Sequence, residues 1–84
     1  MKVILREEVQ LGSGSNVNVY VPKEGAEFAT DEAVHQALQR LIREDLKWLG
    51  DDVTEMNLKE DEGQLYIHGG DYTFLYNVVE VSSI

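Results

Sequence analysis

The sequence predicts an α+β domain in which one helix packs on one face of a β-sheet. Residues 30–50 repeat apolar side chains at spacings of three and four, which is typical of an amphipathic helix. Five other segments alternate apolar with polar residues or are rich in β-branched and aromatic residues, as strands are. The predicted order is strand, strand, helix, strand, strand, strand. Because 84 residues leave room for one hydrophobic core, we expect a single domain over residues 1–84.

A β-hairpin is expected before the helix. Most apolar side chains of residues 2–11 share one parity, and residues 16–21 alternate valine with other residues. Gly12-Ser13-Gly14-Ser15 lies between these strands and supplies a loop of about four to five residues, since glycine tolerates positive φ. A second turn is expected at residues 22–25.

The helix is expected to begin at Thr30 or Asp31 and to end at Gly50. A short oxygen-bearing side chain accepts hydrogen bonds from the free amides of the first turn, and glycine favours the end of a helix. The apolar stripe consists of Val34, Ala37, Leu38, Leu41, Ile42, Leu46 and Leu49. Polar side chains fill the other side, so the stripe should face the sheet.

Three strands are expected after the helix, over residues 53–60, 64–68 and 72–81, with turns at residues 61–63 and 69–71. The last segment is apolar on both faces, which is typical of a central strand. Two arrangements fit: a mixed sheet that wraps the helix, as in β-grasp folds, or an antiparallel sheet with the helix across it. We favour the mixed sheet with the last strand central.

Alternation along the strands sorts their residues into two faces. The aliphatic set is expected to face the helix: Val3, Leu5, Val17, Val19, Val21, Leu65, Ile67, Leu75, Val79 and Val81. The opposite set is Ile4, Arg6, Tyr20, Tyr66, His68, Tyr72, Phe74, Tyr76 and Val78.

One helix covers only one face of a sheet, so the second set should be exposed. Exposed aromatic side chains on a sheet face are typical of contact surfaces. We therefore predict a protein-binding surface made of Tyr20, Tyr66, His68, Tyr72, Phe74 and Tyr76. Two other interpretations stay open: the aromatic pairs only stabilise a half-exposed sheet, or the face self-associates into a homodimer.

Charge and composition exclude several classes of function. Sixteen acidic and seven basic residues give a net charge of −9, which opposes binding to nucleic acid. The absence of cysteine excludes disulfides, thiolate metal sites and cysteine nucleophiles. No apolar run approaches the ~20 residues of a membrane span, and Glu7 and Glu8 interrupt any signal-peptide pattern. We expect a soluble, cytoplasmic protein.

No motif predicts an enzyme, a metal site or a cofactor site. The glycine-serine stretch precedes a strand, whereas phosphate-binding glycine loops open a helix. His35 and His68 lack further ligands at the spacing that zinc requires. Carboxylates such as Glu44 and Asp45 are expected to be solvated, because no spacing places two of them across a pocket.

The sequence therefore predicts a small acidic protein-interaction module, such as an inhibitor, an adaptor or an accessory factor of phage type. The acidic surface favours a basic protein partner. Two alternatives remain. The aromatic face binds single-stranded nucleic acid by stacking, although Arg6 is its only cation. Alternatively, a pocket that contains His68 and two carboxylates makes this a metal-binding or catalytic protein.

The chain is expected to show no measurable affinity for DNA or RNA near physiological salt. Its net charge of −9 opposes the counterion release that supplies most non-specific affinity. Fluorescence anisotropy with a random single-stranded oligonucleotide measures this affinity. Micromolar binding that disappears when the predicted-face tyrosines are replaced by alanine would favour the stacking alternative.

Overall fold

The computed structural model describes residues 2–20 and 30–80, apart from the side chains of Val19 and Tyr20. The elements are β1 (Lys2–Gln10), β2 (Gly14–Tyr20), α1 (Asp31–Leu49), the single 3-10 turn η1 (Gly50–Asp52), β3 (Val53–Asn57), β4 (Leu65–Gly69) and β5 (Tyr72–Glu80). Their order confirms the predicted α+β domain. The turn predicted at residues 22–25, and the expected strand residues Val21 and Val81, lie outside the described residues.

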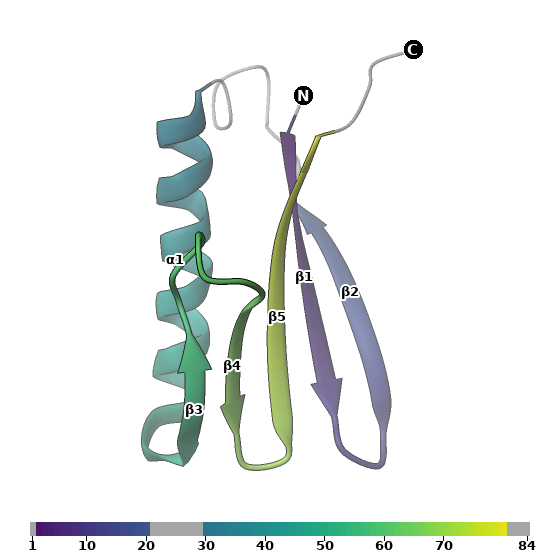
Figure 1. Cartoon of the computed structure of the whole chain (residues 1–84). Helices are drawn as coiled ribbons and strands as arrows, with labels where there is room; N and C mark the ends of the chain where they lie inside the picture. Colours follow the sequence, from purple (N-terminus) through teal and green to yellow (C-terminus); the bar gives the residue numbers. More distant parts are fainter. Residues whose placement is uncertain (1, 21–29, 81–84) are drawn as a thin grey trace.

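The strands form one sheet in the order β2-β1-β5-β4-β3, and every described pairing is antiparallel (Figure 1). β5 is central, as predicted, but the favoured mixed sheet is wrong and the antiparallel alternative is correct. The reason is the path of the chain. α1 returns the chain to the end where β2 began, so β3 runs in the same direction as β2 (Figure 1). The next two strands each reverse direction, which makes β5 antiparallel to both of its neighbours, β1 and β4.

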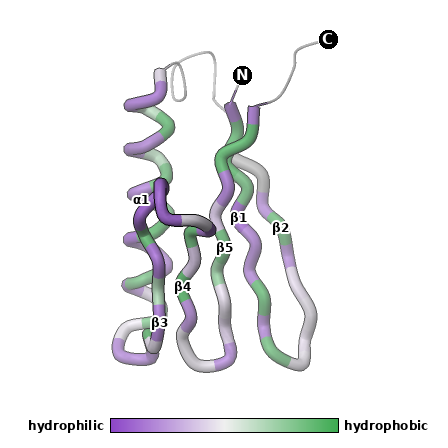
Figure 2. The backbone as a smooth tube through the Cα atoms, viewed as in Figure 1, coloured by the Kyte–Doolittle hydropathy of each residue, from purple (hydrophilic) through white to green (hydrophobic). Residues whose placement is uncertain are grey.

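α1 begins and ends where the sequence predicts. The hydroxyl of Thr30 accepts a hydrogen bond from the Ala33 amide at 3.1 Å. Gly50 has a φ of 58°, and its amide donates to the carbonyl of Leu46. The apolar side of the helix faces the sheet, as the hydropathy colouring shows (Figure 2). α1 is therefore held to the sheet by the stripe that its sequence predicts.

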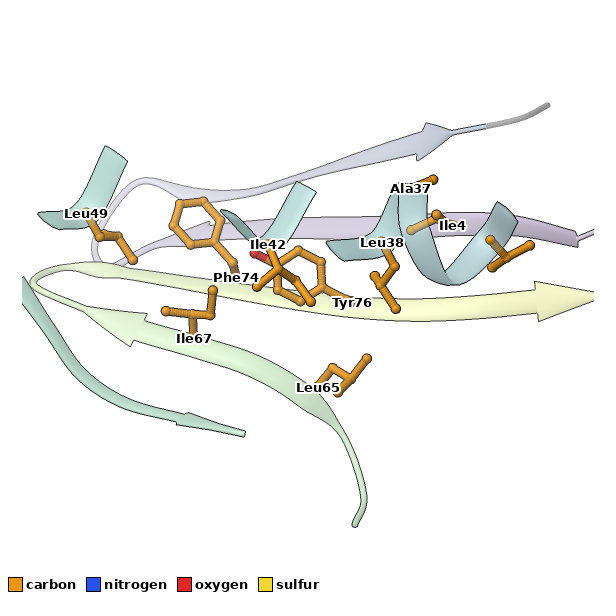
Figure 3. Packing of buried hydrophobic residues seen from close by; sticks show 10 residues of the cluster. Ile4, Ala37, Leu38, Ile42, Leu49, Leu65, Ile67, Phe74 and Tyr76 are labelled. Atoms are coloured by element: carbon orange, nitrogen blue, oxygen red, sulfur yellow. The ribbon is translucent and has the colours of Figure 1, made fainter. Parts of the chain in front are cut away.

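The hydrophobic core lies between α1 and one face of β1, β4 and β5 (Figure 3). Its largest fully buried side chains are Tyr76, Phe74, Ile4, Leu38 and Ile67. Gly69 marks the point of closest approach between the sheet and the end of the helix. A Cβ atom there would lie 3.0 Å from the Leu49 side chain and 3.1 Å from the Asp52 carbonyl oxygen. Glycine at this position allows the end of α1 to close over β4.

The predicted face assignment is correct for β4 and wrong for β5. Leu65 and Ile67 face the helix, as expected. Phe74 and Tyr76 also face the helix, and each is only 1% exposed. Leu75, which was expected in the core, lies on the opposite face because successive residues of a strand alternate.

The same inversion holds for the two strands of the first hairpin. On β1, Ile4 is fully buried in the core, whereas Leu5 lies on the face away from the helix. On β2, Val17 pairs across from Glu7 on that outer face. Alternation defines two sets of residues, but it does not say which set faces the helix, and aromatic rings fill a core as well as aliphatic chains do.

Phe74→Ala is expected to lower the free energy of unfolding by about 3–5 kcal/mol, because it empties a fully buried ring site. Leu75→Ala is expected to cost less than half as much, since Leu75 is only half-buried on the outer face. Urea denaturation of both variants measures the difference. Equal losses would show that both faces of β5 act as core.

Candidate protein-binding surface

The sheet face opposite α1 is covered by no described helix or strand, and we refer to it as the open face. Its residues are Leu5, Glu7 and Val9 of β1, Ser15 and Val17 of β2, Glu55 and Asn57 of β3, Tyr66 and His68 of β4, and Thr73, Leu75, Asn77 and Val79 of β5. Val17 is 56% exposed and Val79 is 37% exposed. Val3 has the same parity and pairs with Val79, but its own side chain is buried.

Tyr66 and His68 form a polar group on the open face. Their ring centroids lie 4.9 Å apart. The Tyr66 hydroxyl donates to Glu55 Oε1 at 2.8 Å, and this bond to a carboxylate raises the pKa of Tyr66. His68 Nδ1 lies 2.7 Å from the hydroxyl of Thr73. These two residues of the predicted surface therefore do lie on the face away from the helix.

The other residues of the predicted surface are not on this face. Tyr72, Phe74 and Tyr76 point toward α1, so their expected exposure is wrong for the reason given above. The side chain of Tyr20 lies outside the described part of the chain. The five of these residues whose side chains are described are thus divided between two sides of the sheet.

Trp48 of α1 covers the helix-side aromatic residues from outside, and it is 61% exposed. Its ring meets Tyr72 edge-on at 4.7 Å between centroids and Phe74 edge-on at 6.1 Å. Tyr72 and Phe74 are nearly parallel, with an angle of 7° between their planes. Trp48 stands outside the apolar stripe of the helix, which is why the sequence pattern did not select it.

Asp45 is a buried carboxylate at the interface between helix and sheet, 7% exposed. Arg6 of β1 donates two hydrogen bonds to this carboxylate, from Nε to Oδ2 at 2.8 Å and from Nη2 to Oδ1 at 2.6 Å. The hydroxyl of Tyr76 donates to the same Oδ2 at 2.5 Å. The guanidinium of Arg6 also lies 4.7 Å from the centroid of the Phe74 ring.

This cluster overturns the expectation that Asp45 is solvated. Burial, followed by the hydrogen bond to Asp45, raises the pKa of Tyr76 far above its ordinary value, so Tyr76 stays a donor. The sequence contained a signal for the burial of Asp45. This residue follows Ile42 by three residues and precedes Leu49 by four, so it lies within the apolar stripe of the helix.

Two adjoining hollows, about 300 and about 230 Å³ in volume, lie beside the C-terminal half of β5. The first is lined by Lys2, Asp31, Val34, His35, Glu60 and Val78, and the second by Glu60, Gly63, Gln64, Leu65, Tyr76, Asn77 and Val78. Lys2 donates to the Asp31 carboxylate, and this bond raises the pKa of Lys2. His35 Nδ1 lies 3.1 Å from Glu60 Oε1.

Within residues 2–20 and 30–80, no three histidine, aspartate or glutamate side chains gather closely enough to hold a metal ion. His68 lies on the open face rather than in either hollow. In the same residues, no helix is both long enough and apolar enough to cross a membrane.

Comparison with known proteins finds no matching family model, no matching curated protein and no matching solved structure.

The free energy of unfolding is expected to fall above pH 10 by up to about 1.4 kcal/mol per pH unit. Because the pKa of Tyr76 is raised in the folded state, the unfolded chain loses this proton first as the pH rises. The stabilisation by Tyr76 is thus complete below pH 10 and is lost above it. Denaturation at pH 8 to 11 measures the slope.

Tyr76→Phe should make the free energy of unfolding nearly independent of pH between pH 10 and pH 11. Tyr66→Phe, which removes an exposed hydroxyl, should leave most of the pH dependence in place. A slope that is unchanged in Tyr76→Phe would contradict the assignment of the buried proton to this residue.

Proposed function

We propose that this chain is a small acidic protein-interaction module of the cytoplasm that binds a protein partner through the open face. The observation that carries the proposal is the set of exposed aliphatic side chains on a sheet face that no described element covers. Such a module acts as an inhibitor, an adaptor or an accessory factor.

The apolar part of the open face supports a contact role. Leu5 and Leu75 are half-buried in its middle, and Val17 and Val79 are more exposed toward its margins. A centre of aliphatic side chains with polar groups such as Tyr66 beside it is the arrangement of many protein interfaces. Removing these side chains from water would favour association.

The charge of the open face supports a basic partner. Glu7 lies between Val17 on β2 and Leu75 on β5, and no described residue forms an ion pair with it. A lysine or arginine of the partner would meet this carboxylate among apolar neighbours. The net charge of −9 would speed the encounter with such a partner and oppose the pairing of two copies.

Val17→Lys is expected to abolish binding of the protein partner, because it places a flexible cation in the exposed apolar area. Asn16→Lys is the matched control, since Asn16 is also exposed, adjoins Val17 on β2 and lies on the helix side. Affinity enrichment from an extract of the native host, with quantitative mass spectrometry, compares both variants with the wild type. Circular dichroism checks that both variants are folded.

A protein that is retained by the wild type and by Asn16→Lys but lost by Val17→Lys would support the proposal. Retention of every such protein by Val17→Lys would contradict it. Sedimentation velocity provides an independent test: a wild-type dimer that Val17→Lys dissociates would show that this face pairs two copies instead.

A further inference from the structure

The central strand β5 is longer than its neighbour β4. β1 pairs with β5 from Tyr72 to Glu80, whereas β4 pairs with it only from Tyr72 to Tyr76. The last residues of β5, 77–80, therefore have β1 on one side and no described strand on the other. The middle strand of the sheet becomes an edge strand over this stretch (Figure 1).

The hydrogen bonds identify which backbone groups face this edge. The amide of Leu11, which directly follows β1, donates to the carbonyl of Asp71 at 2.8 Å. The backbone amides and carbonyls of the odd-numbered residues of β5 therefore point toward β1. Alternation then directs the amide and carbonyl of Val78 away from β1. On the same edge, the Tyr76 carbonyl accepts a hydrogen bond from Gln64 Nε2 at 2.9 Å. The Gln64 side chain thus supplies the hydrogen bond that a neighbouring strand would otherwise donate to Tyr76. Val78 is the next residue of β5 whose amide and carbonyl point toward this edge.

The two hollows flank this edge, and together we refer to them as the edge groove. Val78 lines both hollows, and Val34 and Leu65 add apolar surface from α1 and β4. Its charged groups are the pairs Lys2–Asp31 and His35–Glu60. Two carboxylates therefore line the groove beside one ammonium group and one imidazole ring.

We propose that the edge groove binds an extended peptide segment of a partner protein, which adds to the sheet as a short strand beside Val78. The added backbone takes the position that β4 would occupy if it continued, and it pairs with the amide and carbonyl of Val78. An aliphatic side chain of the peptide packs on Val34, Leu65 and Val78. A lysine or arginine next to it meets Glu60.

The site is separate from the open face. Val78 has the helix-side parity, whereas the open face is formed by residues of the other parity. Binding in the edge groove is therefore independent of the function proposed above, and each is tested by its own variants.

The probe is an octapeptide of alternating valine and lysine, acetylated and amidated at its ends. We expect it to bind and to shift the backbone NMR signals of Val34, His35 and Val78. The same peptide methylated at alternate backbone nitrogens should bind at least about tenfold more weakly, because strand addition needs those donors. Equal affinity of the methylated peptide, or shifts confined to the open face, would overturn the proposal.

Two substitutions separate the groove from general charge attraction. Glu60→Lys should weaken binding by about tenfold, whereas Asp61→Lys should have a much smaller effect. Both change the net charge equally and lie in the same loop, but only Glu60 lines the groove. Equal weakening by both would overturn the proposal.

Val78→Pro removes the backbone donor that faces the groove together with the valine side chain that lines it, and it leaves the backbone donors of β5 that face β1 in place. A folded Val78→Pro variant should lose peptide binding, and full binding by that variant would overturn the proposal. The methylated peptide tests the same hydrogen bonds without changing the chain, so the result does not depend on this variant folding.

Discussion

The buried carboxylate of Asp45 determines which face of the sheet packs against α1. A charge that is removed from water costs several kcal/mol unless a cation and hydrogen-bond donors surround it. Arg6 and Tyr76 meet this need, and both lie on the same face of adjacent strands because they pair across β1 and β5. The described residues of the opposite face include no arginine or lysine, so that face would leave the carboxylate without the guanidinium that Arg6 supplies. Asp45 therefore favours packing of the helix on the side of the sheet that carries Arg6.

This choice assigns the two kinds of apolar side chain to opposite sides. Phe74 and Tyr76 are used inside, where the ring of Phe74 also supports the Arg6 guanidinium. The aliphatic residues of the other parity, such as Leu75 and Val17, are left on the open face. A surface of aliphatic groups around Glu7 differs from the tyrosine surface that the sequence suggested. Of the six residues expected from the sequence, Tyr66 and His68 are on this face, beside the carboxylate of Glu55.

The sequence was sufficient for the elements but not for the sides of the sheet. Thr30, Gly50 and the regular apolar spacing of α1 specify the helix through local hydrogen bonds and periodicity, so its ends were predicted correctly. β4 was also assigned correctly, because Leu65 and Ile67 alternate with polar partners. β5 is apolar on both faces, so alternation alone does not indicate which of its faces packs against the helix. The residue that distinguishes the two faces is Asp45, which lies on the helix. The edge groove could not be predicted, since it arises from the unequal lengths of β4 and β5, which depend on the pairing register and on the Gln64 hydrogen bond.

The most direct test of this account is a double-mutant cycle on Arg6 and Asp45, measured by urea denaturation. Arg6→Met alone leaves a buried carboxylate without its cation and is expected to lower the free energy of unfolding by about 3–5 kcal/mol. The double variant Arg6→Met with Asp45→Leu removes both charges and should regain most of that loss. Losses that add to within about 0.5 kcal/mol would contradict the account, because they would mean that the two side chains do not hold the helix and the sheet together as a pair.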